Sequence, residues 1–106
     1  MYKLEFLPTA KNDMLEIIKY ISNELKNPIA ASKLAENFIA SAENICNFPY
    51  SNNVYTPIKP LEQEYRRIIV KNYMMFYTVN ESTKTVTIMR VIYAKKILIN
   101  KYSNKK

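Results

Sequence analysis

The sequence contains no glycine and no histidine, and its single cysteine is Cys46. Without glycine the chain cannot form a Gly-rich phosphate-binding loop. Without histidine it can form neither a His-assisted nucleophile nor a His metal site. One cysteine is also too few for a structural zinc site. We therefore expect a protein that needs no metal and no cofactor.

Long apolar runs are absent as well. No stretch approaches the ~20 apolar residues that a membrane-spanning helix requires, and Met1–Phe6 alternates apolar and polar residues before Pro8, unlike a signal peptide. Cys46 lies late in a helical apolar pattern, which predicts a small buried side chain rather than a reactive thiol. A lone cysteine of this kind fits a reducing compartment, so we expect a cytoplasmic protein.

The charge balance is strongly basic. Sixteen Lys plus Arg residues against nine Asp plus Glu residues leave a formal net charge of +7 on 106 residues. This length predicts one domain, 1–106, with a core that needs no disulfide. The charge predicts an anionic partner, for which nucleic acid, an acidic protein and a membrane surface are the candidate classes.

The N-terminal half predicts a strand followed by two helices. Tyr2–Phe6 alternates like a half-buried strand, and Pro8 suits the first turn of a helix. Asn27 would cap a second helix that ends at Pro49. Apolar residues recur every three or four positions in both helices: Ala10, Met14, Ile17, Ile18, Ile21 and Leu25 in the first, and Ala31, Leu34, Phe38, Ala42, Ile45 and Phe48 in the second.

The C-terminal half predicts three strands, Tyr65–Lys71, Tyr73–Val79 and Lys84–Tyr93, in which β-branched and aromatic residues are frequent. The short polar breaks between them favour an antiparallel meander. A proline-containing loop, 52–63, precedes the strands, and a basic tail, 97–106, follows them. We therefore expect an α+β fold of order β-α-α-β-β-β, in which a two-helix hairpin packs on one face of an antiparallel sheet.

Several short segments follow one another in a recognisable order: Tyr2–Phe6 with Pro8–Ala10, Asn27–Pro28 with Ala30–Ala31, Phe48–Pro49, Tyr65–Ile68, Lys71–Tyr73, Phe76–Glu81 and Ile88–Tyr93. No single segment is diagnostic. Their order and spacing resemble the RelE/ParE superfamily of toxins from bacterial type II toxin–antitoxin modules over nearly the whole chain. The resemblance implies a growth-arresting protein that a cognate antitoxin holds inactive.

One branch of this superfamily, the RelE- and YoeB-like toxins, consists of ribosome-dependent messenger-RNA endonucleases. Such cleavage needs a base, an acid and cations around the scissile phosphate. The resemblance assigns these catalytic roles to Arg66, Lys96 and Tyr102. Three other positions depart from the nuclease patterns: Met74 replaces a phosphate-binding arginine, Ile68 replaces a lysine of RelE, and Lys59 replaces a candidate glutamate base of YoeB.

The other branch, the ParE-like toxins, is thought to poison DNA gyrase by binding alone. Ile88–Lys96 resembles their third-strand pattern, in which an arginine precedes a basic cluster, although Lys95 and Lys96 replace paired arginines and Ile97 replaces an acid. We favour this branch. The expected target-binding residues, for gyrase or for a ribosome with its messenger RNA, are Arg66, Arg90, Tyr93, Lys95 and Lys96.

The resemblance also implies an antitoxin partner, with a higher-order toxin–antitoxin complex as an option and no membrane partner. An acidic amphipathic tail would be steered to the basic protein, lie on apolar patches and extend the open sheet edge. The expected antitoxin-binding residues are Tyr20, Phe38, Ile39 and Tyr50.

Two simpler interpretations compete with these roles. Arg66 and Arg90 can each instead pair with an acid such as Glu62, Glu64 or Glu81 in an exposed ion pair of little energetic value. A non-catalytic nucleic-acid-binding module would also carry a charge of +7. The first helix, however, mixes acidic residues with its basic ones, which disfavours sequence-specific DNA reading by this chain.

Overall fold

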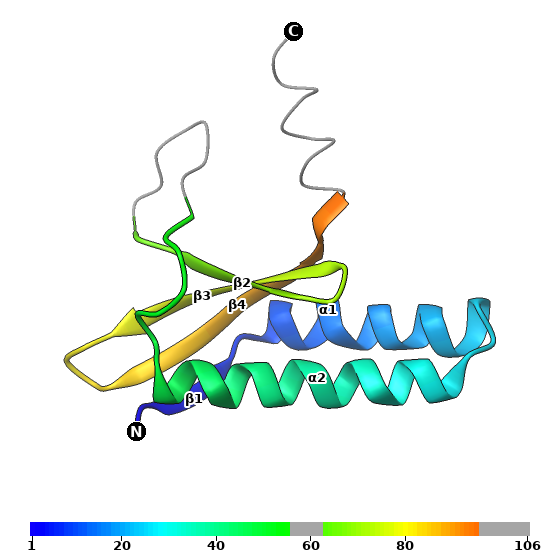
Figure 1. The fold of residues 1–106 in the computed structure, drawn as a ribbon, viewed down its shortest axis with the longest axis horizontal. Coiled ribbons are helices and arrows are strands. Elements are labelled where there is room, and N and C mark those ends of the chain that lie inside the picture. The colour runs from blue at the N-terminus through cyan, green and yellow to red at the C-terminus, as the bar shows by residue number, and fades with distance from the viewer. Residues whose placement is uncertain (56–62, 96–106) are drawn as a thin grey trace, which may run out of the picture.

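The computed structural model describes residues 1–55 and 63–95, so the predicted basic tail lies outside the described residues. The elements are β1 (Lys3–Phe6), α1 (Pro8–Lys19), η1 (Tyr20–Glu24), α2 (Pro28–Asn47), β2 (Arg66–Val70), β3 (Tyr73–Asn80) and β4 (Thr85–Tyr93). Figure 1 shows α1 and α2 lying side by side on one face of the sheet. The α+β architecture predicted from the sequence is confirmed.

The helical hairpin follows the predicted pattern with one change. Pro8 occupies the first turn of α1, and the side chain of Asn27 caps α2 by accepting a hydrogen bond from the backbone N–H of Ala30 at 3.1 Å. The first helix does not stay α-helical to Leu25, because its last turn is the π-helical segment η1. Such single π turns widen a helix locally and are frequent at functional sites.

The three C-terminal strands form the antiparallel meander that the sequence predicts, in the spatial order β4-β3-β2. Two lysines take left-handed backbone conformations in the turns, Lys71 (φ 57°) and Lys84 (φ 53°), and Lys26 does so before α2 (φ 52°). Glycine is the usual residue at such positions because a Cβ atom destabilises this conformation. In a chain without glycine, lysine fills all three.

The position of β1 corrects the prediction of a wholly antiparallel sheet. β1 pairs with β4 in parallel, with Lys3 opposite Thr85 and Phe6 opposite Ile88. Parallel neighbours need a long crossover connection, which here consists of the helical hairpin and the first two meander strands. The alternating pattern of Tyr2–Phe6 predicted a strand, but alternation does not say beside which strand, or in which direction, it pairs.

The core lies between the helical hairpin and the sheet. Its largest fully buried side chains come from α2 and the two central strands: Phe38, Ile45, Met75, Tyr77, Val86 and Ile88. Cys46 is buried in the same cluster, as predicted. No helix in the described part of the chain is both long enough and apolar enough to cross a membrane.

Phe38 is therefore misplaced among the expected antitoxin-binding residues. Its side chain is 1% exposed and packs edge-on against Tyr73, with the ring centroids 5.8 Å apart. The reason is the helical period, since Phe38 lies on the same stripe of α2 as Leu34, Ala42 and Ile45. Its neighbour Ile39 points away from the core and is 45% exposed.

Adjacent substitutions in α2 test this division. We expect Phe38→Ala to lower the free energy of unfolding by about 3–5 kcal/mol, because it removes a buried aromatic ring and leaves a cavity. Ile39→Ala should change it by less than about 0.5 kcal/mol, as is usual for surface sites. Urea unfolding of both variants measures the difference. Equal losses would contradict the assignment of Phe38 to the core and Ile39 to the surface.

Candidate functional site

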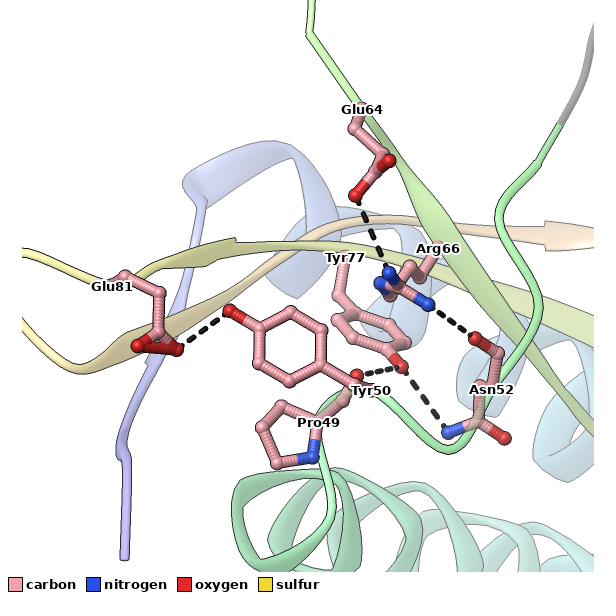
Figure 2. A network of polar contacts seen from close by, with 7 residues as sticks. All are labelled: Pro49, Tyr50, Asn52, Glu64, Arg66, Tyr77 and Glu81. Atoms are coloured by element: carbon pink, nitrogen blue, oxygen red, sulfur yellow. Dashed lines mark hydrogen bonds and ion pairs between the residues drawn. The ribbon is translucent and has the colours of Figure 1, made fainter.

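Arg66, the first residue of β2, is held in a network with the loop that follows α2 (Figure 2). Its Nη1 donates to the backbone carbonyl of Asn52 at 2.8 Å, and its Nη2 lies 3.4 Å from a carboxylate oxygen of Glu64. The guanidinium carbon also lies 5.0 Å from the ring centre of Tyr50, a cation–π distance. With its side chain only 17% exposed, Arg66 ties this loop to the sheet.

Tyr77 of β3 belongs to the same network, and Figure 2 shows its hydroxyl pointing from the sheet toward Pro49 and Asn52. Its ring is fully buried, so its hydroxyl needs partners inside the protein. The hydroxyl donates to the backbone carbonyl of Pro49 at 2.8 Å and accepts from the side-chain amide of Asn52 at 3.2 Å. Burial raises the pKa of Tyr77, so it stays protonated at neutral pH and acts as a structural clamp between α2 and β3.

Glu81, in the turn between β3 and β4, is a second hub. Its carboxylate accepts hydrogen bonds from the hydroxyls of Tyr50 (2.6 Å) and Tyr2, and from the ammonium of Lys84 (2.8 Å). The bonds from Lys84, Tyr2 and Tyr50 lower the pKa of Glu81 to about 2, and the bond to Glu81 raises the pKa of Tyr50 to about 12. Glu81 therefore joins the N-terminus, the loop after α2 and the hairpin turn.

These contacts define the environment of Arg66. It pairs with Glu64, as the simpler interpretation predicts, whereas Glu81 pairs with Lys84 and not with an arginine. Glu62 lies outside the described residues. Because both terminal nitrogens of Arg66 and one face of its guanidinium have partners, it is built into the framework of the protein.

Arg90 has a different environment at the opposite edge of the sheet. Its Nε donates to Asp13 Oδ2 at 2.7 Å, and its Nη2 donates to Asp13 Oδ1 at 3.0 Å, a two-point ion pair with α1. The same Oδ2 accepts the backbone N–H of Val91 at 2.9 Å. Asp13 is 13% exposed and the Arg90 side chain is 51% exposed, so the cation reaches solvent from a sheltered acid.

The sheet register separates Arg66 from Arg90. Arg66 pairs with Tyr77, which faces the core under the helices, whereas Arg90 pairs with Phe76. Residues paired across an antiparallel ladder project to the same face, and successive residues project to opposite faces. The two arginines, both among the expected target-binding residues, therefore leave the sheet on opposite sides. Arg67 shares the side of Arg90, because it also pairs with Phe76.

Tyr93, the last residue of β4, lies on the helix-facing side. Its ring centre is 5.6 Å from that of Tyr73, and the Tyr93 side chain is 43% exposed. Both rings line a groove of about 1060 Å³ between the sheet and the end of the helical hairpin where η1 connects to α2, and Tyr20, Lys33 and Lys71 line it as well. Burial is the main cause that raises the pKa of Tyr73, and the nearby Tyr93 and Tyr20 raise it further. The groove is thus largely apolar, and its charged lining combines the basic Lys33, Lys71 and Arg90 with the acidic Asp13 and Glu16.

The three remaining antitoxin-binding candidates are exposed but do not form one patch. Tyr20 begins η1, Ile39 lies midway along α2, and Tyr50 follows the end of α2. Since α2 spans 20 residues at ~1.5 Å per residue, Tyr20 and Tyr50 lie near opposite ends of a ~30 Å helix. Of the expected antitoxin-binding residues, only Tyr20 lines the groove.

The other expected site residues fall at or beyond the end of β4. Lys95 is exposed just after this strand, whereas Lys96 and Tyr102 lie outside the described residues. Within residues 1–55 and 63–95, no three acidic or cysteine side chains gather in a way that would hold a metal ion. The proposed nuclease trio is therefore described only at Arg66.

Sequence reasoning missed Asp13, Asn52 and Tyr77 as partners of the arginines and loops. Asp13 sits between apolar positions of α1, where an acid has no reason to be sheltered unless it meets a cation. That position was the available signal. Tyr77 gave none, because one of nine tyrosines in an apolar strand cannot be distinguished as the buried one.

Comparison with known proteins identifies a family profile and several similar folds. A family profile described as "ParE toxin of type II toxin-antitoxin system, parDE" matches residues 4–98. A search of curated proteins returned no match. Among solved structures, the chromosomal ParDE toxin–antitoxin system of P. aeruginosa is similar with a TM-score of 0.68 at 15% identity, covering 88% of this chain and 96% of that chain.

Two further structures share the fold. A metal-bound toxin from Helicobacter pylori has a TM-score of 0.60 at 14% identity, covering 92% of this chain and 99% of its own. The RelBE2 toxin–antitoxin complex of Mycobacterium tuberculosis has a TM-score of 0.58 at 18% identity, covering 87% and 96%. At these identities the similarity shows the fold alone.

The Glu81 hub predicts a specific acid dependence of stability. Because the folded-state pKa of about 2 lies below the usual value of 4.5, the ionised carboxylate stabilises the protein above pH 4.5. That contribution is lost as the pH falls toward 2. We expect the gap in unfolding free energy between the wild type and Glu81→Gln to be largest at neutral pH and to close by about pH 2.

Urea unfolding at several pH values and constant ionic strength measures this gap. Tyr50→Phe is the matched control, since it removes one of the three donors to Glu81 and should narrow the gap without abolishing it. A gap that does not change between pH 7 and pH 2 would contradict the assignment.

Proposed function

The chain belongs to the family of ParE toxins of type II toxin–antitoxin systems, and on that premise we propose that it arrests growth by binding and poisoning DNA gyrase. The observation that carries the proposal is the environment of Arg90. It is the half-exposed arginine at the edge of β4, it is oriented by Asp13, and it lies in the segment whose sequence resembles ParE-like toxins.

The condition of the nuclease positions supports a binding mechanism. Met74, where RelE- and YoeB-like toxins carry a phosphate-binding arginine, is 6% exposed and cannot hold an anion. Arg66 is occupied by Asn52, Glu64 and Tyr50. A messenger-RNA endonuclease would therefore depend on Lys96 and Tyr102 and on release of Arg66 from its network.

The proposed partner that relieves the arrest is a cognate antitoxin with an acidic segment. The exposed apolar side chains Tyr20 and Leu25, together with Ile29, cluster at the end of the hairpin, and β1 lies at the edge of the sheet with one paired side. An amphipathic helix and an added strand use surfaces of these two kinds. The net charge of +7 would steer an acidic chain toward them. The proposal places the protein in the cytoplasm, where gyrase acts.

Pulse-labelling after induced expression tests the target. We expect DNA synthesis to stop before protein synthesis, with gyrase-dependent DNA breaks. Arg90→Ala should weaken growth arrest by roughly thirtyfold, the equivalent of about 2 kcal/mol for an interface anchor. Lys95→Ala should weaken it less, because a rim lysine contributes mainly to the rate of association.

Lys11→Ala is the control, since Lys11 is an exposed cation on α1 that we assign no role. An early stop in protein synthesis with messenger cleaved on ribosomes would overturn the gyrase proposal in favour of the endonuclease. Undiminished DNA and protein synthesis at full expression would contradict both.

A further inference from the structure

Two side chains of helix α1 bind the backbone of β4 next to Arg90, one before it and one after it. The hydroxyl of Thr9 donates to the backbone carbonyl of Met89 at 2.9 Å, and the carboxylate of Asp13 accepts the backbone N–H of Val91 at 2.9 Å. Thr9 and Asp13 are four residues apart and so lie one above the other on the same face of the helix. Two side chains of α1 therefore bind the residues immediately before and after Arg90.

These two hydrogen bonds from α1 take the place of strand pairing where β1 has ended. β1 pairs with β4 only as far as Ile88, where the N–H of Leu7 donates to the carbonyl of Ile88 at 3.0 Å. Beyond that point the edge of β4 would have unpaired backbone groups, which natural proteins cover or pair. Thr9 and Asp13 satisfy two of them, but of the two only Asp13 also binds the side chain of Arg90.

A register shift falls at the same place. Tyr77 of β3 pairs with Ile88, but Phe76 pairs with Arg90, so Met89 is an extra residue on β4. Bulges of this kind bend a strand and redirect the side chain beside them, and they are over-represented next to active sites. With this extra residue, the side chain of Arg90 points away from the core and lies at the strand edge, where it binds Asp13.

The Asp13 carboxylate then orients the guanidinium itself. It accepts from Nε and Nη2 side by side, which leaves Nη1 without a partner among the described residues. An arginine held by two parallel hydrogen bonds presents its remaining N–H groups as a fixed fork, whereas a free surface arginine samples many rotamers. Arg90 remains 51% exposed in this orientation.

A purely stabilising ion pair explains these facts less well. Asp13 already has a backbone partner in Val91, and a neutral side chain such as asparagine would supply that acceptor without sheltering a charge. Half-exposed ion pairs contribute little to stability, so the second and third hydrogen bonds are better explained by what they do to Arg90. They restrict its conformation while leaving it accessible.

We propose that Asp13 is a positioning residue, which holds the Arg90 guanidinium ready to receive a carboxylate on the surface of the protein that the toxin attacks. This inference rests on the proposed function, because it takes Arg90 as a target-contacting residue. Pre-ordering the side chain lowers the entropy that binding would otherwise cost, and therefore strengthens binding without any contact from Asp13 to the target.

A double-mutant cycle tests the inference in the full-length protein. Asp13→Asn keeps an amide oxygen for the Val91 N–H but breaks the two-point pair with Arg90. We expect it to raise the intracellular toxin level needed for half-maximal growth arrest by about tenfold, the order expected when a rotamer-rich side chain loses its preordering. In the Arg90→Ala background the same substitution should have no further effect on that level.

Thr9→Val is the matched control, because it removes the hydrogen bond to the other side of the bulge and leaves the Arg90 pair intact. We expect it to change unfolding midpoints but not the toxin level for arrest. Arg90→Lys keeps the charge and loses the fork, and should lower potency as much as Asp13→Asn does. If Asp13→Asn folds poorly, Arg90→Lys tests the inference in its place.

Three results would overturn the inference. One is an Asp13→Asn or Arg90→Lys variant that arrests growth at the wild-type level. Another is a loss of potency from Asp13→Asn that is just as large in the Arg90→Ala background. The third is a Thr9→Val loss equal to that of Asp13→Asn. Failure of the gyrase proposal is recognised separately, because pulse-labelling would then show protein synthesis stopping first while the cycle still reports on Asp13 and Arg90.

Discussion

The packing of α2 against the central strands is the interaction on which the rest of the structure depends. Phe38 and Ile45 of α2 and Met75, Tyr77 and Ile88 of the sheet are all fully buried together. Burying an aromatic or branched side chain contributes about 1.5–3 kcal/mol, so this layer supplies much of the driving force for folding. Because Tyr77 is buried with its hydroxyl, the same layer requires a polar arrangement around Pro49 and Asn52.

The hydrogen bonds that the buried Tyr77 hydroxyl requires also determine the contacts of Arg66. The loop after α2 is bound to Tyr77, and Arg66 then binds the loop through the carbonyl of Asn52. An arginine at the start of β2 would be a candidate for an anion site if its N–H groups were free. Here its N–H groups bind Asn52 and Glu64, so that Arg66 connects the loop to the sheet.

Sequence periodicity predicted the elements well and their relationships poorly. The helices, the meander and the Asn27 cap follow from local chemistry, because three- and four-residue spacing and turn residues act within one segment. The parallel pairing of β1 and the extra residue at Met89 arise from contacts between distant segments, for which no local pattern exists. The polar breaks predicted the turns, but without glycine they gave no sign that Lys26, Lys71 and Lys84 adopt left-handed conformations there.

The candidate site shows the same division at the level of single residues. Arg66 and Arg90 look alike in the sequence, since each lies in an apolar strand, and the resemblance to toxins gave weight to both. Their faces were separated by the one-residue shift between Phe76 and Tyr77, which no count of alternation across a single strand can reveal.

The edge of a sheet is where such an arginine can be both oriented and accessible. In the middle of a face, Arg90 would be covered by neighbours or left free to move. At the edge, the helix that replaces the next strand offers an acid to hold the side chain while solvent reaches the other side. Because β1 ends at Phe6, the strand edge beside Arg90 is left to α1, and Arg90 is both oriented by Asp13 and half exposed.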